Sequence, residues 1–355
     1  MSLKFTVLFL LFIGQHSFAS DCLKTRGAFD IGSEETKLKI AVVDTCKNKI
    51  KEILVEERRP INFLGNVIAE PKNEFTLEFL LQAASEINEM KSLGEEYQVQ
   101  EWTAVVTSAF RKASNAKESN EKLQILTRLN IAIIDDKLEA EIGFYGALSI
   151  ADTPKEKLVV MDLGGGSAQI SFYDKTAKKV KSYTNELSSR HAKNFLYKVI
   201  QKRDTSLRKD QWDPNPISKD EAQKLFSFYS KILFNEFNES KYLDFSSVKL
   251  HYQLLQPDTK LVGIGGVIAK GVGRTLTGET YGTLSLQSLN EGLEGLINKS
   301  SDELGGGPYV QTDVSNVLLV MAYLNTFAQS SSAQVQYANL SLTEGLLIFP
   351  ELVKQ

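Results

Sequence analysis

Apolar residues along the chain fall into two patterns, short continuous runs and longer stretches with helical spacing. Short runs rich in Val, Ile and Phe indicate strands, whereas apolar residues that recur every three or four positions indicate amphipathic helices. Up to residue 150, the first pattern predicts strands at 27–31, 38–43, 53–57, 101–107 and 131–135. The second pattern predicts helices at 75–91, 116–129 and 137–150. This order of elements is typical of an α/β domain.

The pattern restarts after the segment Ala-Asp-Thr-Pro-Lys at 151–155, which we interpret as a linker or hinge. Two predicted strands with a glycine-containing turn between them follow it, as they do near the start of the chain. This repetition, at 27–43 and 158–173, indicates a weak internal duplication with one copy in each half. The remaining predictions are strands at 158–162, 169–173 and 260–264, helices at 218–238, 286–298 and 314–328, and loops at 203–216 and 302–308.

The length of 355 residues exceeds that of one compact core and suits two domains. We predict domains at 20–150 and 151–355, preceded by a separate segment at 1–19. A hydrophobic content of 42% with 24% charged residues is typical of a soluble globular protein. The net charge of −3 argues against duplex nucleic acid as a partner, because such binders carry a basic excess. A local basic pocket for a polyanion stays open.

The first 19 residues have the pattern of a secretory signal peptide. A basic residue precedes an apolar run at 5–14 that is too short to span a bilayer, and Ser17 and Ala19 are the small residues before a cleavage site. The alternative is that the run forms a first strand. We expect export to the periplasm or the medium, with no stable membrane anchor, because Cys22 lacks the small preceding residue that lipoprotein processing needs.

The predicted strands place the two cysteines of the chain opposite each other. If the strands at 27–31 and 38–43 pair as a hairpin that turns near Glu34, positions whose numbers sum to about 68 face each other. Cys22 and Cys46 satisfy this sum. We therefore predict a disulfide between them, which would persist in an oxidising compartment. Two free thiols are the alternative.

The segment VVMDLGGGSAQISF, at 159–172, is the strongest candidate for a ligand site. A buried strand ends at Asp162, where a carboxylate is placed to hold Mg²⁺ directly or through water. Ser167 adds a hydroxyl donor, and successive backbone N–H groups in a tight glycine turn can bind an anion. A plain β-hairpin is the alternative, although two turn residues would suffice for it. The glycines of this turn are Gly164, Gly165 and Gly166.

A shorter motif, FDIGSEETKLKI, carries Asp30, Gly32 and Ser33 in the same order. Alone this pattern is weak, and a simple turn explains it equally well. Two such loops, one from each half, would clamp a polyphosphate if they faced each other across a cleft. No Walker loop, zinc-type Cys/His spacing or Gly-x-Ser-x-Gly elbow occurs, and three histidines in all disfavour a histidine-centred mechanism.

The two loops resemble the phosphate-1 and phosphate-2 motifs of the actin/sugar-kinase/Hsp70 superfold, whose domains are ribonuclease H-like. Four further segments resemble the exopolyphosphatase/guanosine pentaphosphate phosphatase (Ppx/GppA) family. They are VVTSAFRKASN at 105–115, DDKLEAEIGFYGAL at 135–148, VGIGGVIAKGVG at 262–273 and SLTEGLLIFP at 341–350. The resemblance covers nearly the whole chain after the signal segment. It implies a two-domain, actin-like α/β fold with an interdomain cleft.

The resemblance also implies roles for individual residues. Arg111 matches the arginine that contacts phosphate, to which a guanidinium fork is suited, and Glu139 matches the catalytic base that orients or deprotonates water. An exposed arginine and a solvated glutamate are the alternatives. Gly265 and Gly266 lie in the third glycine motif and are expected at the phosphates. The expected activity is Mg²⁺-dependent removal of the terminal phosphate from polyphosphate or guanosine pentaphosphate.

Several positions depart from the family pattern. Acidic residues stand at 34–35, 135–136 and 141, where they should repel a polyanion unless a metal or a lysine compensates. Gln169 replaces a glutamate. The loops also resemble those of the apyrases, extracytoplasmic nucleoside di- and triphosphate hydrolases in which a glutamine at this position helps to organise metal and water. We therefore expect Asp162 and Gln169 to order the metal.

Two other functions stay open. An apyrase-like nucleotidase would need planar side chains beside a purine base, for which Tyr309 and Phe327 are available without a diagnostic spacing. A non-catalytic sensor of phosphate ligands is favoured by the altered loop flanks and opposed by the retained Arg111 and Glu139. A homodimer is compatible with the sequence.

Overall fold

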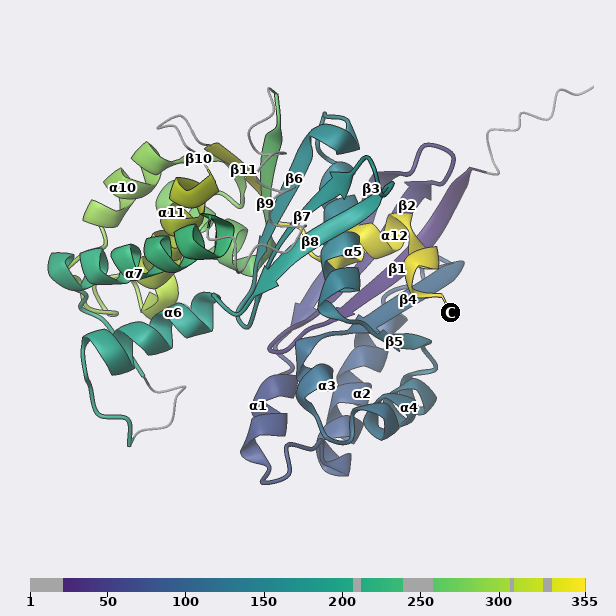
Figure 1. The fold of residues 1–355 in the computed structure, drawn as a ribbon. Coiled ribbons are helices and arrows are strands. Elements are labelled where there is room, and N and C mark those ends of the chain that lie inside the picture. Colours follow the sequence, from purple (N-terminus) through teal and green to yellow (C-terminus); the bar gives the residue numbers. More distant parts are fainter. Residues whose placement is uncertain (1–21, 207–211, 239–257, 307–309, 328–333, 355) are drawn as a thin grey trace, which may run out of the picture.

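The computed structural model describes residues 22–206, 212–238, 258–306, 310–327 and 334–354. The predicted signal peptide lies outside this part. Two β-sheets with helices packed on them make up the fold (Figure 1). In the part of the chain that the structure describes, no helix is long and apolar enough to cross a membrane.

The first sheet has the strand order β3-β2-β1-β4-β5. The first three strands pair antiparallel, whereas β4 and β5 join in parallel. The strands are β1 (Leu23–Ile31), β2 (Thr36–Asp44), β3 (Lys49–Arg59), β4 (Glu101–Val106) and β5 (Ile131–Ile133). The helices of this half are α1 (Phe63–Ala69), α2 (Leu77–Ser92), α3 (Ser108–Lys112), α4 (Ala116–Thr127) and α5 (Asp136–Leu148).

The second sheet has the order β10-β11-β9-β6-β7-β8. Its strands are β6 (Leu158–Leu163), β7 (Ala168–Asp174), β8 (Lys179–Asn185), β9 (Lys260–Ile264), β10 (Tyr281–Ser285) and β11 (Gln334–Ala338). The helices are α6 (Ser189–Phe195), α7 (Lys219–Asn238), α9 (Arg274–Thr277), α10 (Leu286–Glu294), α11 (Asp313–Phe327) and α12 (Leu342–Ile348). Shorter turns are η1 (Lys155–Lys157), the π-helical η2 (Leu196–Ile200) and η4 (Gly266–Gly273), η5 (Val310–Thr312) and η6 (Pro350–Val353).

The two sheets repeat one topology. Strands β8-β7-β6-β9-β11 follow the same order as β3-β2-β1-β4-β5, with three antiparallel strands continued by two parallel ones. Strand β10 is an additional antiparallel edge. The duplication predicted from the two glycine turns therefore extends to both whole sheets, and the predicted actin-like α/β fold class is confirmed.

Most predicted elements occur at or near their expected positions. The helix predicted at 75–91 is α2, where the Thr76 hydroxyl accepts the N–H of Phe79 and one face buries Leu80, Ala83, Ala84, Ile87 and Met90. The predicted strand at 131–135 ends at residue 133, because Asp135 caps α5. Strands β8, β10 and β11 were not predicted. Strands β8 and β10 carry polar residues at the two edges of the sheet, and β11, which lies between β10 and β9, is only five residues long.

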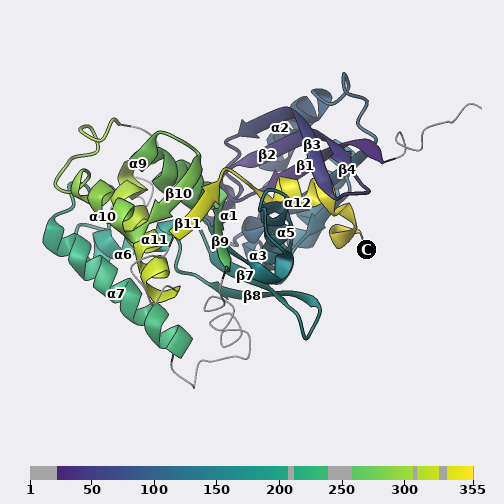
Figure 2. The same ribbon diagram turned by 90° about the horizontal axis from the view of Figure 1, so that it is seen from above.

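Helices α5 and α12 lie between the two sheets (Figures 1 and 2). Helix α5 packs on β6 to β8, and α12 packs on α5, β1 and β2. Gly345 permits this close approach, because a Cβ atom there would lie 2.1 Å from the carbonyl oxygen of Ile142. The closing L-x-E-G-L-L segment thus joins the core beside the first sheet. The domain boundary predicted after residue 150 stays a prediction.

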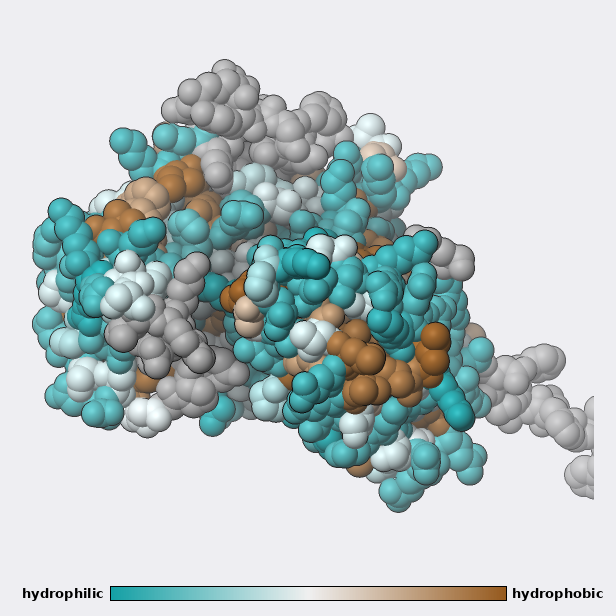
Figure 3. Space-filling view, turned by 90° about the horizontal axis from the view of Figure 1, so that it is seen from below, coloured by the Kyte–Doolittle hydropathy of each residue, from teal (hydrophilic) through white to brown (hydrophobic). Residues whose placement is uncertain are grey.

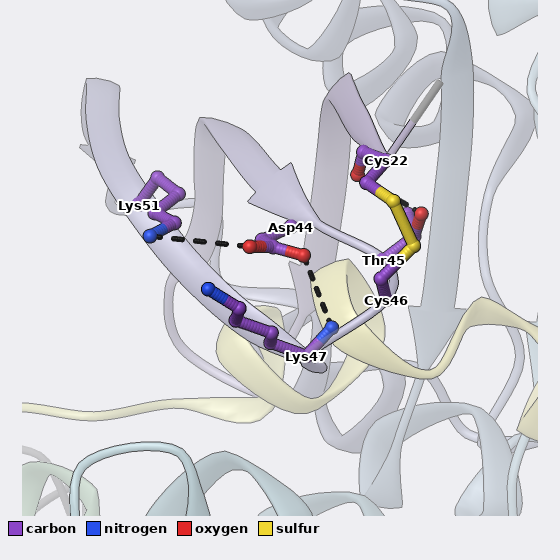
Figure 4. The surroundings of a disulfide bond; sticks show 6 residues. All are labelled: Cys22, Asp44, Thr45, Cys46, Lys47 and Lys51. Atoms are coloured by element: carbon purple, nitrogen blue, oxygen red, sulfur yellow. Dashed lines mark hydrogen bonds and ion pairs between the residues drawn. A yellow bond between two sulfur atoms is a disulfide. The ribbon is translucent and has the colours of Figure 1, made fainter. Parts of the chain in front are cut away.

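The predicted Cys22–Cys46 disulfide is present and joins the residue before β1 to the turn between β2 and β3 (Figure 4). The two Cα atoms are 5.4 Å apart. The two sulfurs and Asp44 also form the one tight group of potential metal ligands among the described residues. Because both sulfurs are oxidised, this group is not a thiolate metal site.

The surface is predominantly polar, with separate apolar areas (Figure 3). Brown atoms gather in the half of this view that holds the helices of the first sheet. The large apolar side chains exposed on α1, α2 and α4 are Ile68, Leu77, Leu81 and Ile125.

Candidate active site

The first loop follows β1, and its aspartate is already paired with a lysine. Asp30 and Lys37 face each other in the β1–β2 register, and Nζ of Lys37 donates to Oδ2 of Asp30 at 2.9 Å. Asp30 is 4% exposed, so the ammonium compensates a carboxylate that would otherwise be buried alone. The N–H of Gly32 donates to the Glu35 carbonyl oxygen at 3.1 Å and closes the turn.

The second loop follows β6 and has a corresponding but uncharged partner. Asp162 and Gln169 face each other in the β6–β7 register. The Gln169 amide donates to the Ser167 hydroxyl at 2.8 Å, and the N–H of Gly164 donates to the Ser167 carbonyl oxygen at 3.0 Å. Buried Gln169 therefore orders the loop without forming an ion pair with Asp162.

Gly265 brings the third glycine motif against the second loop. Its φ of +85° lies in the region that favours glycine, and a Cβ atom would lie 2.3 Å from Oδ1 of Asp162. Any larger residue would displace that carboxylate. Gly266, which follows it, opens the π-helical segment η4 and has nothing within 4 Å of where its Cβ would be.

The two loops face each other, as predicted. The Ser33 and Ser108 hydroxyls are 2.6 Å apart, and a Cβ atom on Gly166 would lie 3.9 Å from the Ser108 oxygen. On the other side, a Cβ atom on Gly165 would lie 3.9 Å from Oε2 of Glu34. The glycines of the second loop thus lie near Glu34 of the first loop and near Ser108 at the start of α3, which contacts Ser33.

Arg111 and Glu139 contact each other beside these loops. Arg111 donates from NH1 to Oε2 of Glu139 at 2.9 Å and to the Ile134 carbonyl oxygen at 2.8 Å, and its NH2 pairs with Asp136. Asp135 accepts the N–H of Leu138 and starts α5, the helix that carries Glu139. The acidic residues at 135–136 are therefore occupied by a helix cap and an ion pair.

Burial and neighbouring charges raise the pKa of two carboxyl groups. The pKa of Glu139 is raised to about 7, mainly by burial; Arg111 opposes the rise, and the charges of Asp162 and Asp30 add to it. Burial also raises the pKa of Asp162 to about 6, against the attraction of Lys37 and with the repulsion of Asp30. Perturbed groups that cluster in this way are typical of catalytic sites.

The donor set fits a hard divalent cation. Asp30, Asp162 and the side-chain oxygen of Gln169 are the oxygen ligands that Mg²⁺ prefers. The mutual repulsion of the carboxylates, which raises two pKa values, is what a bound cation would remove. A metal role for Asp162 and Gln169 stays a prediction that these residues fit.

Several residues around the loops were not singled out from the sequence. Lys37, Ser108, Arg190 and Lys270 all contact loop residues. Lys37 and Ser108 lie inside motifs that were recognised, so their place beside an aspartate and a serine could have been examined. Arg190 lies in no recognised motif and gave no signal. Of the aromatic residues considered for a purine base, Tyr309 and the side chain of Phe327 lie outside the described part.

Comparisons with known proteins agree with the predicted family. Residues 42–191 match the Ppx/GppA phosphatase family. No curated protein sequence gives a significant match. The Ppx/GppA family member from Aquifex aeolicus has a TM-score of 0.70 at 20% identity, over 93% of this chain and 98% of that one. An exopolyphosphatase from Cytophaga hutchinsonii has a TM-score of 0.64 at 20% identity, over 93% of this chain and 99% of that one.

A structure of nucleoside triphosphate hydrolases from Neospora caninum is also similar, with a TM-score of 0.51 at 11% identity over 93% of each chain. At these identities a structural likeness shows the fold alone. The matched segment at 42–191 contains Arg111, Glu139 and the whole second loop, whereas Asp30 and Gly265 lie outside it. The resemblance inferred from the motifs is confirmed: the chain matches the Ppx/GppA phosphatase family over residues 42–191, and its fold is similar to that of solved members of the family over 93% of its length.

Proposed function

We propose that this chain is an exported, Mg²⁺-dependent phosphohydrolase that removes the terminal phosphate from polyphosphate or from guanosine pentaphosphate. The match to a phosphatase family supports a hydrolase acting on phosphoanhydride bonds. The observation that carries the proposal is the buried Glu139 carboxyl, which Arg111 holds beside two aspartate loops and whose pKa is raised to about 7.

Glu139 is suited to act on water at neutral pH. A general base works best when its pKa lies near the working pH, because it is then partly ionised and still basic enough to accept a proton. The side chain is 16% exposed, which leaves it a route to solvent. Arg111 fixes the carboxylate through Oε2, so the second oxygen, Oε1, is the one proposed to receive the proton from water.

Arg111 would contact the transferred phosphate by exchanging one partner. Its NH2 pairs with Asp136, whose side chain is 48% exposed and can turn into solvent at small cost. A phosphate oxygen at NH2 would then share the guanidinium with Glu139. This arrangement would place the base and the phosphorus on either side of the attacking water, with positive charge where the transition state is most anionic.

The two loops would hold the phosphates. The N–H groups of Gly165 and Gly166 and the hydroxyls of Ser33 and Ser167 are the proposed donors to phosphate oxygens. Asp162 and Gln169, with Asp30 beside them, would hold Mg²⁺ directly or through its water ligands. When bound, the cation supplies charge neutralisation of the phosphate chain.

A nucleoside triphosphate hydrolase is the second candidate. It is favoured by Gln169, the residue that the apyrase loops carry at this position, which is buried and donates a hydrogen bond to Ser167 within the loop. The two candidate functions use the same loops and the same base, and therefore only the preferred substrate distinguishes them.

Phosphate release from long-chain polyphosphate, guanosine pentaphosphate and ATP, each with Mg²⁺, tests the proposal. We expect Glu139→Gln to lower the rate roughly 1,000-fold on the preferred substrate, because a general base contributes about 10²- to 10⁴-fold. Glu141→Gln is the matched control, a partly buried carboxylate on the same helix, and should keep near wild-type activity. If wild type and Glu139→Gln are equally inert on all three substrates, the proposed hydrolase activity is wrong.

Export is proposed from the signal segment and is supported by the disulfide, because structural disulfides persist outside the reducing cytosol. We expect the mature protein to begin at Ser20. Mass spectrometry of the protein recovered from the periplasm or the medium measures this, and a chain that keeps its first 19 residues in the cytosol would contradict it.

A further inference from the structure

Two carboxylates of the first loop are each paired with a cation from the opposite half of the molecule. Glu34 pairs with Arg190 at the start of α6, and Glu35 lies 3.7 Å from Nζ of Lys270 in η4. These are the acidic positions that depart from the family pattern and that should repel a polyanion. In the folded protein these carboxylates pair with cations to which a polyanion could bind.

Both cations are anchored directly beside the second phosphate loop. The backbone N–H of Arg190 donates to the Gly165 carbonyl oxygen at 3.2 Å, so the guanidinium starts from the glycine turn and reaches across to Glu34. Lys270 lies in η4, the segment that begins after Gly265, whose Cα is packed against Asp162. The guanidinium of Arg190 and the ammonium of Lys270 therefore reach the first loop from two different segments that adjoin the second.

The pairs are weak enough to be exchanged. The side chains of Glu34 and Arg190 are 53% and 35% exposed, and those of Glu35 and Lys270 are 28% and 31% exposed. Ion pairs this open to solvent add little net stability. A phosphate oxygen carries a stronger and better-fitting charge for a guanidinium than a mobile carboxylate does. Burial lowers the pKa of both cations, so each gains from an anion held close to it.

Glu35 has a further partner that can keep it when Lys270 is withdrawn. Arg58 on β3 donates to Glu35 at 3.1 Å and to the side-chain oxygen of Asn339 at 3.0 Å. Glu35 can thus remain paired with Arg58 while Lys270 turns to a ligand. Glu34 has no such second partner among its described contacts, and it lies at the more exposed edge of the loop.

On the basis of the proposed function, we propose that Arg190 and Lys270 bind the phosphates that follow the one being cleaved, and that Glu34 and Glu35 occupy these cations until a phosphate chain displaces them. The ligand class is a linear oligophosphate, because two cations that meet adjacent residues of the first loop, Glu34 and Glu35, match successive anionic groups. The two glutamates set the chain length at which binding becomes favourable, since only a chain that reaches both cations displaces both carboxylates.

Steady-state phosphate release from tripolyphosphate and from long-chain polyphosphate tests this. Arg190→Gln and Lys270→Gln should each raise KM about 10-fold on the long chain with little change in kcat, since a charge-assisted hydrogen bond to phosphate is lost. The double variant Glu34→Gln, Glu35→Gln should lower KM about 3- to 10-fold, because the competing carboxylates are gone. The rise in KM caused by Lys270→Gln should be smaller on tripolyphosphate than on the long chain, because a short chain has fewer phosphates to reach both cations.

Matched controls remove the effect of net charge. Glu118→Gln with Glu121→Gln changes two exposed carboxylates on α4 by the same total charge, and Lys157→Gln removes an exposed cation from the second half. If the Glu34, Glu35 variant has the KM of the α4 control, the inference is wrong. The Glu34, Glu35 variant carries this test even if Arg190→Gln fails to fold.

Calorimetric titration of tripolyphosphate into the same variants, in a Glu139→Gln background, separates this inference from the proposed function. If wild type turns over polyphosphate but neither KM nor the binding constant shifts, the inference fails and the function stands. If wild type is inert while the binding constants shift in the stated directions, the proposed function fails and the assignment of Arg190 and Lys270 to phosphate binding stands.

Discussion

The two halves of the molecule use one hairpin design with opposite charge balance. In each half the second-last residue of a strand is an aspartate, a glycine turn follows, and the residue seven positions after the aspartate faces it across the ladder. In the first half this residue is Lys37, which forms an ion pair with Asp30 at 2.9 Å. In the second half it is Gln169, which bonds Ser167 and leaves Asp162 without an ion pair among the described contacts.

The different partner residues give the two aspartates different electrostatic surroundings. Lys37 supplies the first loop with its own cation, so Asp30 needs no further partner to be buried. Burial raises the pKa of the Asp162 carboxyl to about 6, which fits the proposal that this carboxylate binds a cation. Two copies of one hairpin thus place an ion-paired aspartate on one side and, on the other, an aspartate without an ion pair among the described contacts.

Replacing Gln169 by lysine should remove the electrostatic difference between the two loops. Gln169→Lys would place an ammonium beside Asp162 as Lys37 is placed beside Asp30, and it would occupy the position we assign to Mg²⁺. We expect phosphate release to fall about 1,000-fold, the size of effect seen when a charge-stabilising group is lost from an active site. The rate with Mg²⁺ on the preferred substrate is the measurement.

Gln169→Glu is the matched control, since it restores the family residue and keeps an oxygen ligand. It should retain activity within about tenfold of wild type. Thermal unfolding of both variants checks that the buried position tolerates the change. Should Gln169→Lys keep more than a tenth of the wild-type rate while remaining folded, an uncharged residue at this position is not what activity requires, and the proposed difference between the two loops is wrong.

Much of the fold followed from local pattern, because buried strands and long amphipathic helices carry their signal within a few residues. The strand predicted at 260–264 is β9 itself, and both aspartates lie within the strands from which their loops begin. The edge strands β8 and β10 were missed because polar residues suffice where one side of a strand is open, and the inner strand β11 was missed because it is only five residues long. The packing of α12 on the first sheet depends on a contact between Gly345 and Ile142, some 200 residues apart, which no local pattern encodes.

The candidate site was predicted in its residue types and missed in its charge pairing. The motifs identified Arg111, Glu139 and both loops, and the structure brings them together. The pairing of Arg111 with Asp136, and of Glu34 with Arg190, joins segments whose distance in sequence hides their contact. Acidic residues that looked incompatible with a polyanion are neutralised by these partners.

The smallest effect we expect concerns stability and sharpens the same contrast. The pKa of Asp162 is about 6 in the folded protein against an ordinary value of 3.8. Between these values the folded protein binds more protons than the unfolded chain, so the free energy of unfolding falls as pH rises through this window. Asp162→Asn removes this contribution, which we place at about 2 kcal/mol after allowance for partial exposure.

Urea unfolding at pH 4 and pH 7, with EDTA present, measures the fall in stability for wild type and for Asp162→Asn. The variant should lose about 2 kcal/mol less over this interval, while Glu121→Gln, an exposed carboxylate on α4, should behave like wild type. Glu139, whose pKa is also raised, does not mask the difference, because Asp162→Asn removes one of the charges that raise this pKa and so changes stability in the same direction. Equal losses in wild type and Asp162→Asn would mean that the second aspartate is compensated as fully as the first, and the contrast between the hairpins would no longer rest on charge.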